Sequence, residues 1–179
     1  MIAAIIQDSP IINQKSETIQ KTLDLIEIAS NTGADLIVFG ETWLCGYPVW
    51  LDICSNVAIW DHEPVKTVWS EMYNCAMDIS NGDLELIQKA AKAKKIWIVI
   101  GANEKIGKGK GNGTLFNSVI TISNIGQIEN VHRKLMPTYT EKLIHGTGDG
   151  AGLKSIETSF GNLGALICWE HWMPLTRQA

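Results

Sequence analysis

The sequence predicts one α/β domain in which buried strands alternate with surface helices. Three largely apolar runs, at residues 2–6, 34–39 and 96–101, end in polar or glycine residues, as buried strands do. Between the first two runs, Ile19 and Ile26 belong to a set of apolar residues at helical spacing. Strand, helix and strand within about 40 residues form a βαβ-type unit. A chain of 179 residues is long enough for one such core and short for two.

The other elements follow from the same signals in chain order. The first helix covers residues 16–29, and the segment from Gly40 to Trp60 is irregular and rich in aromatic residues. Loops of this length in compact domains usually shape a site. A hairpin begins at residues 125–128. Two further helices and two further strands are predicted at residues 64–77, 84–94, 117–123 and 164–167.

Composition and charge exclude several classes of partner. The net charge is −4 and no long block of one sign occurs, so neither nucleic acid nor an anionic membrane surface is expected to bind. No run of about 18 apolar residues could span a membrane, and the N-terminus lacks the basic start of a signal peptide. The four cysteines are dispersed, which favours free thiols. We therefore expect a cytoplasmic protein.

The last stretch, from Gly164 to Leu175, carries the most distinctive chemistry. A short apolar segment, predicted as a buried strand, ends at Cys168 and is followed by a polar turn flanked by aromatic residues. Nucleophiles are often found on such sharp exits from a strand, where the side chain is exposed above the sheet. A buried cysteine taken alone is more often an inert small hydrophobic residue. Both interpretations remain open from this stretch alone.

Three chemically complementary residues follow three predicted strands. Glu41 comes after the second strand, Lys134 after the hairpin and Cys168 after the closing strand. A carboxylate in a partly desolvated pocket can take the thiol proton, and an ammonium group can stabilise the negative charge that forms after attack. Spacing alone does not bring the three together. A glutamate after a strand is usually a solvated loop residue, and a lysine beside an arginine usually lies on the surface.

Three stretches resemble the signature motifs of the nitrilase superfamily of carbon-nitrogen hydrolases. They are Phe39-Gly40-Glu41-Thr42-Trp43-Leu44-Cys45-Gly46-Tyr47-Pro48, Arg133-Lys134-Leu135-Met136-Pro137-Thr138 and Cys168-Trp169-Glu170-His171. They occur in the order of the family and at fitting separations, and the resemblance covers essentially the whole chain. The last motif, with the Met-Pro-Leu that follows it, is similar to the nitrilase branch.

The resemblance implies a role for each matching residue. Cys168 is similar to the nucleophile of the family, Glu41 to its general base and Lys134 to the residue that stabilises the tetrahedral intermediate; Glu141 matches a second glutamate of the site. The implied reaction converts a small nitrile to a carboxylic acid and ammonia through a thioimidate and a thioester on Cys168, with no metal or organic cofactor. An aliphatic amidase would share these residues and is the alternative activity.

Further residues have both a site interpretation and a simpler one. Aromatic residues in these positions suit the core as well as the wall of a substrate pocket, and the pocket candidates are Trp43, Tyr47, Trp169 and His171. Cys168 and His171 form a C-x-x-H pair, but no second closely spaced pair accompanies it, so zinc is not expected. Glu170 and His171 are expected to shape the turn rather than to act chemically.

The resemblance also implies an αββα sandwich, of which residues 1–179 would form a single carbon-nitrogen hydrolase domain that is incomplete at its C-terminus. In the family, further strands and helices follow the cysteine. An uncovered sheet edge is an aggregation hazard, so an inactive fragment or assembly partner is a second hypothesis. A homo-oligomer, a dimer or larger, is expected from the family.

Overall fold

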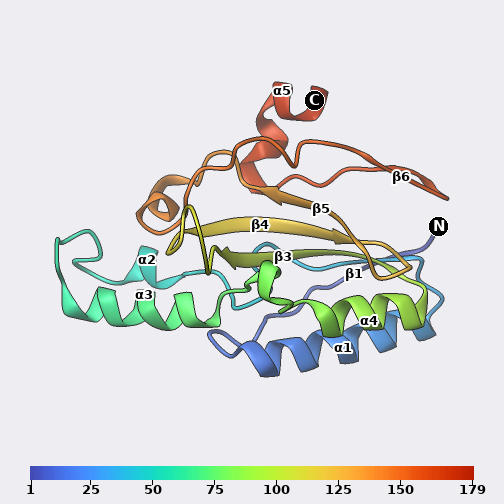
Figure 1. The fold of residues 1–179 in the computed structure, drawn as a ribbon, viewed down its shortest axis with the longest axis horizontal. Helices are drawn as coiled ribbons and strands as arrows, with labels where there is room; N and C mark the ends of the chain where they lie inside the picture. The colour runs from blue at the N-terminus through green and yellow to red at the C-terminus, as the bar shows by residue number, and fades with distance from the viewer.

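The computed structural model describes residues 1–179 and has a five-stranded mixed sheet at its centre (Figure 1). Its strands lie side by side in the order of the sequence. The first three are parallel and the last two antiparallel, which fits a βαβ unit followed by a hairpin. The strands are β1 Ala3–Ile5, β2 Leu36–Val38, β3 Trp97–Lys105, β4 Leu115–Ile122 and β5 Ile128–Arg133.

Two helices cover one face of this sheet. α1, Lys15–Asn31, and α4, Glu85–Lys94, lie side by side beneath it, while α3, Glu63–Cys75, extends beyond the end of the strands (Figure 1). The helices predicted from the apolar spacing are therefore confirmed. The remaining helical segments are short: α2 Trp50–Ile53, α5 Pro174–Gln178 and the 3₁₀ turns η1 Ile79–Asn81, η2 Tyr139–Leu143 and η3 Cys168–Trp172.

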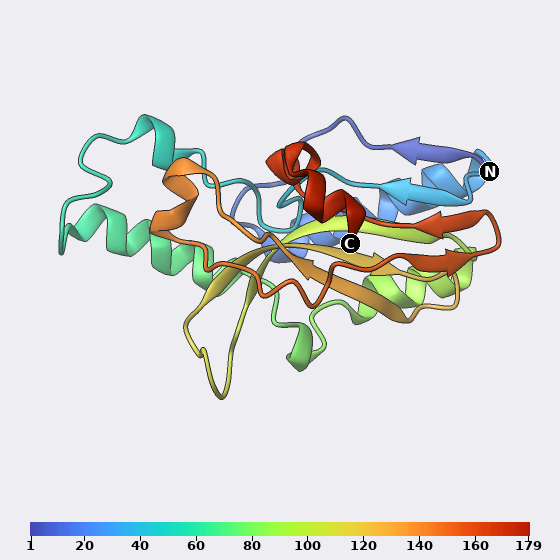
Figure 2. The same ribbon diagram turned by 90° about the horizontal axis from the view of Figure 1, so that it is seen from above.

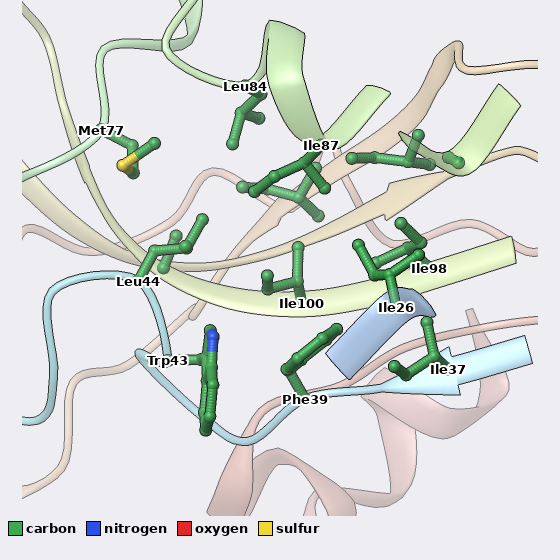
Figure 3. Packing of buried hydrophobic residues seen from close by; sticks show 14 of the residues in the cluster. Ile26, Ile37, Phe39, Trp43, Leu44, Met77, Leu84, Ile87, Ile98 and Ile100 are labelled. Carbon is green, nitrogen blue, oxygen red and sulfur yellow. The ribbon is translucent and has the colours of Figure 1, made fainter. Parts of the chain in front are cut away.

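The main core lies between the sheet and these helices. Figure 3 shows Ile98 and Ile100 of β3 facing Ile26 of α1 and Ile87 of α4, all of them fully buried. Each such side chain contributes about 1.5–3 kcal/mol by leaving water. Phe39 packs on Trp43 with ring centroids 5.1 Å apart, at the start of the long loop after β2. The core therefore fixes the loop that carries Glu41.

The opposite face of the sheet carries a small two-stranded ribbon. It consists of β6, Ile156–Thr158, and β7, Gly161–Leu163, and it crosses over the larger sheet in Figure 2. Phe160 at its turn packs edge-on against Trp97, with ring centroids 6.2 Å apart. Helices, sheet and ribbon thus form successive layers, as the predicted α/β class requires.

Two strand predictions need correction. Residues 164–167 are not a strand, because their backbone has no neighbouring strand with which to form a ladder; only Ile167 among them is fully buried. β3 continues past its apolar run to Lys105, because the buried carboxylate of Glu104 is paired with Arg133 and hydrogen-bonded by Ser118. None of the helices has the length and apolarity needed to cross a bilayer.

Candidate active site

Glu41 lies on the turn that leaves β2, where the backbone passes very close to β3. The Leu44 N–H donates to the Gly101 carbonyl oxygen at 3.0 Å, which fixes the turn against the sheet. A Cβ atom on Gly101 would lie only 2.3 Å from the Gly40 carbonyl oxygen, so glycine is required there. Thr42, next to Glu41, has a φ of 50°. On this tight turn the Glu41 side chain is 27% exposed.

The Lys134 ammonium group connects two carboxylates below the surface. Lys134 follows β5 and its side chain is 1% exposed. Its Nζ donates to Glu41 Oε1 at 3.0 Å and to Glu141 Oε1 and Oε2 at 3.0 and 2.9 Å. Burial opposes the charged form, but the two carboxylates outweigh it and raise the pKa of Lys134. The lysine therefore stays charged in a buried site.

Glu141 is itself held in place by its own turn. Its Oε2 accepts from the Thr138 backbone N–H at 3.1 Å, and the Thr138 side chain completes a capping box at the start of η2. The Tyr47 hydroxyl donates to Glu141 Oε1 at 3.0 Å. Burial raises the pKa of Glu141, but the hydrogen bond from Lys134 and that from Thr138 outweigh it, so the net pKa is lowered. Burial and the neighbouring Glu141 raise the pKa of Tyr47.

Cys168 lies at the first position of η3 and its side chain is exposed. Its φ of 52° is in the left-handed region, which is uncommon for a residue with a side chain. The turn is held by Glu170, whose carboxylate accepts from the Ile167 N–H at 2.7 Å and the Leu135 N–H at 2.8 Å. His132 Nε2 lies 2.9 and 3.0 Å from the two oxygens of the same carboxylate. The expectation that Glu170 shapes the turn is thereby confirmed.

Glu170 joins the Cys168 turn to the segment that carries Lys134. Its carboxylate is fully buried, and burial alone would raise its pKa. The hydrogen bonds from His132, Leu135 and Ile167 outweigh burial, so the pKa of Glu170 is lowered and the group stays ionised near neutral pH. One buried negative charge thus fixes two parts of the site relative to each other.

A cleft of about 300 Å³ brings Glu41 and Cys168 together. Its polar lining includes Glu41, Asn117, Cys168 and His171, and its walls are apolar side chains of β2, β3 and β4 and of the segment before η3. Lys134 lies behind Glu41, as the hydrogen bond between them requires. The structure therefore brings Lys134 into direct contact with both Glu41 and Glu141, and places Cys168 on the cleft that Glu41 lines.

Three of the four predicted pocket residues do not line this cleft, and only His171 does. Trp43 is a core residue, 2% exposed, and its Nε1 donates to Thr22 of α1 at 2.8 Å. Tyr47 contacts Glu141 rather than the cleft. Trp169 is 57% exposed and packs near Trp172, with ring centroids 6.2 Å apart. For Trp43 the simpler interpretation was right, because a large apolar ring gains most from full burial.

Sequence reasoning did not identify Asn117 and His132 as parts of the site. Asn117 lies in β4 and donates to Glu41 Oε1 at 2.7 Å, whereas His132 lies in β5 and contacts Glu170. Asn117 is a polar residue at a buried position of a predicted strand, and an unexplained polar residue in a core strand is the signal that could have found it. His132 follows the start of the predicted hairpin, in a segment expected to be irregular, whereas the structure extends β5 through it. No group of three or more His, Cys, Asp or Glu side chains is arranged to hold a metal ion.

Comparison with known proteins gives consistent matches along the chain. The family model for carbon-nitrogen hydrolase matches residues 2–179. An aliphatic nitrilase of Sinorhizobium fredii (strain HH103) is 35% identical over 99% of this chain and 55% of its own length. Nitrilase 2 of Arabidopsis thaliana is 34% identical over 99% of this chain and 50% of its own. The chain thus spans about half the length of the curated relatives it matches.

Solved structures show the same fold. A carbon-nitrogen hydrolase from Helicobacter pylori G27 superposes with a TM-score of 0.71 at 23% identity, covering 99% of this chain and 55% of that one. An amidase from Nesterenkonia sp. superposes with a TM-score of 0.63 at 16% identity, covering 94% of this chain and 55% of that one. At these identities the likeness is one of fold.

Proposed function

The chain belongs to the carbon-nitrogen hydrolase family, and on that premise we propose that it carries the site of a nitrilase-type hydrolase, which converts a nitrile to a carboxylic acid and ammonia. The observation that carries the proposal is that Cys168 and Glu41 line one cleft while Lys134 contacts the Glu41 carboxylate. A nucleophile, a base and a fixed positive charge are the groups that such a hydrolysis needs. The nitrilases among the relatives support the nitrile as substrate.

In the first half of the reaction, Cys168 Sγ attacks the nitrile carbon as Glu41 takes the thiol proton. That proton passes to the nitrile nitrogen, giving a thioimidate on Cys168. Water then adds to the thioimidate carbon, the carbon–nitrogen bond breaks and ammonia leaves. A thioester on Cys168 remains.

In the second half, Glu41 activates another water, which attacks the thioester carbonyl. The carbon–sulfur bond breaks, the carboxylic acid leaves and Cys168 regains its proton. The reaction therefore consumes two waters and releases one ammonia for each nitrile. It requires neither an oxidant nor a reductant.

Lys134 stabilises the negative charge that develops on the nitrogen or oxygen of each intermediate. All three of its N–H groups face carboxylate oxygens in the structure, one of Glu41 and two of Glu141. It therefore acts through its charge and by turning one N–H from the two-oxygen contact with Glu141 toward the intermediate. Glu141 is the supporting residue that keeps this charge in the buried site.

The test is mass spectrometry of the folded chain incubated with a small set of aliphatic and aromatic nitriles, with ammonia release followed in parallel. We expect a covalent adduct on Cys168 and ammonia release, both abolished in Cys168→Ala. The matched control is Cys54→Ala, which removes another exposed free thiol far from the cleft in sequence and should change neither signal. A folded chain with neither adduct nor ammonia would contradict the proposal and favour an inactive assembly partner.

An amidase is the second candidate, because an amide reaches the same Cys168 thioester by losing ammonia from its first tetrahedral intermediate. The fold shared with the Nesterenkonia amidase is compatible with it. Ammonia release from amides but not from nitriles, in the same assay, would assign the amidase activity instead.

We also propose that residues 1–179 form the N-terminal part of a single carbon-nitrogen hydrolase domain, that the protein acts in the cytoplasm and that it assembles as a homo-oligomer. The match of the family model to residues 2–179 supports the first point, and four free cysteines support a reducing compartment. Several large apolar side chains remain exposed, including Ile5, Trp60 and Leu175, and contact between copies would cover them. Sedimentation velocity tests the assembly, and a monomer at all concentrations would contradict it.

A further inference from the structure

Asn117 lies in the sheet and contacts both Glu41 and Lys134. Its side chain Nδ2 donates to Glu41 Oε1 at 2.7 Å, and its backbone carbonyl accepts from the Lys134 N–H at 2.8 Å. The residue is 1% exposed and belongs to β4, which pairs along its length with β3 on one side and, from Ser118 onward, with β5 on the other. Asn117 is therefore fixed by the sheet, whereas Glu41 lies on a turn.

The chemistry of the pair determines which end of the amide faces Glu41. The Glu41 carboxylate also accepts from the Lys134 ammonium at 3.0 Å, so the carboxylate is a hydrogen-bond acceptor in the site. An amide oxygen in the same position would face a carboxylate oxygen without a proton between them. The Nδ2 group must therefore face Glu41, which leaves Asn117 Oδ1 buried without a partner.

Both hydrogen bonds to Glu41 end on the same oxygen. Oε1 accepts from Asn117 and Lys134, while no side chain or backbone group donates to Oε2. Oε2 is thus the oxygen left to accept a proton in the cleft that Glu41 shares with Cys168. Two donors on one oxygen also fix the plane of the carboxylate.

We infer that Asn117 is a positioning residue for the general base, which orients Glu41 so that Oε2 faces the reacting groups. The inference rests on the proposed function for its catalytic consequence. Its structural content, a hydrogen bond from the Asn117 amide to the Glu41 carboxylate, does not depend on turnover. A carboxylate that accepts a hydrogen bond is protonated at lower pH than one that does not.

Other charged and titratable groups around Glu41 come from several elements. Lys134 contacts it directly, Glu141 lies on the other side of Lys134, and Tyr47 donates to Glu141. Cys168 and His171 line the same cleft. A substitution of Asn117 leaves all of these groups in the chain, so a change in the titration of Glu41 reports the loss of the amide donor.

The experiment follows the Glu41 carboxyl carbon by NMR in the full chain labelled with ¹³C in glutamate side chains. The resonance is assigned with Glu41→Gln and titrated in wild type, Asn117→Leu and Asn117→Ala. We expect the midpoint to rise by roughly 1 pH unit in both Asn117 variants, as the loss of a charge-assisted hydrogen bond implies. Asn117→Ala adds neither charge nor bulk, and it decides the question if the leucine variant does not fold.

The matched control is Asn130→Leu. Asn130 is also a buried asparagine of the same sheet and donates its amide to the Gly152 carbonyl oxygen at 2.8 Å, away from Glu41. Asn130→Leu should destabilise the fold without changing the pH midpoint of the Glu41 titration. An unchanged midpoint in the Asn117 variants, or an equal shift in Asn130→Leu, would overturn the inference.

Kinetics then test the catalytic consequence. For the hydrolysis of a nitrile, the acid limb of kcat/KM should move to higher pH in the Asn117 variants, with kcat reduced more than KM is raised. A midpoint shift in the Asn117 variants, together with a wild-type chain that releases no ammonia, would leave the positioning role standing and refute the proposed function. Wild-type turnover with no shift in either titration or kinetics would refute the positioning role alone.

Discussion

Replacing Glu170 by alanine perturbs the site without touching any residue that would react. The Glu170 carboxylate is fully buried and is shared among the Ile167 N–H, the Leu135 N–H and His132. Alanine cannot accept any of these hydrogen bonds, so two backbone N–H groups and an imidazole nitrogen are left without an acceptor. The variant therefore tests whether one buried charge holds the Cys168 turn.

The expected loss can be estimated from the contacts. A hydrogen bond to a charged group contributes about 1.5–3 kcal/mol net, and contributions that share one carboxylate do not simply add. Removing one partner of a buried charged pair costs about 3–5 kcal/mol. We therefore expect Glu170→Ala to lower the free energy of unfolding by about 4 kcal/mol. Glu170→Gln keeps one acceptor oxygen and should cost about half as much.

Urea unfolding followed by tryptophan fluorescence measures the difference, since the chain contains seven tryptophans. The matched control is Glu157→Ala, which removes an exposed glutamate of β6 and should change the free energy of unfolding by less than about 0.5 kcal/mol. A loss below about 1 kcal/mol in Glu170→Ala would refute the reasoning, because a buried charge with these partners cannot be removed so cheaply.

The pH dependence gives a second readout of the same carboxylate. The pKa of Glu170 is lowered in the folded chain from an ordinary value of 4.5. Its stabilisation is therefore complete above that ordinary value and is lost as the pH falls through the lower folded value. The difference in stability between wild type and Glu170→Ala should accordingly be constant near neutral pH and shrink below about pH 4.5.

Two other substitutions test separate supports of the site. Gly101→Ala places a Cβ 2.3 Å from the Gly40 carbonyl oxygen, so it should displace the Glu41 turn and lower the free energy of unfolding by about 2 kcal/mol. Gly40→Ala is the control: no atom lies within 4 Å of its Cβ, and it should lower the free energy of unfolding far less in the same urea assay. Equal losses would contradict the close approach. Burial lowers the pKa of His145 to about 4 from 6.5, so the unfolded chain takes up the proton first and stability falls as the pH drops from about 6.5 to 4. His145→Gln should flatten this dependence and the partly exposed His62→Gln should not; a slope that survives in His145→Gln would assign it to another group.

The apolar pattern predicted the sheet and helices well because their burial is a local property of the sequence. The runs at β1, β2 and β3 and the spacing in α1 and α4 need only a neighbouring apolar face, and each lies where it was expected. The apolar pattern does not predict the end of β3, which includes the charged residue Glu104. Glu104 is buried because Arg133, 29 residues away, pairs with it. A local sequence pattern cannot predict an ion pair with a residue so far away in the sequence.

The same distinction between local and distant signals applies to the candidate site. Glu41, Lys134 and Glu141 were found through motif resemblance, and the structure brings their side chains into contact. Asn117 was missed because its partner Glu41 lies 76 positions away in the sequence. Trp43 was a candidate for the pocket because aromatic residues near a motif suit a binding site as well as a core; its burial and its hydrogen bond to Thr22 decide for the core.

The error at residues 164–167 has a further physical meaning. An apolar segment before a nucleophile suggested a strand, yet the backbone there bonds to a carboxylate instead of to a ladder. Cys168 at positive φ costs about 1–2 kcal/mol relative to an ordinary conformation. The Glu170 contacts on either side are strong enough to offset that cost and to hold the thiol exposed above the cleft. The conformation of the turn thus depends on a charge that also anchors the segment before Lys134, so thiol and ammonium are fixed by one group.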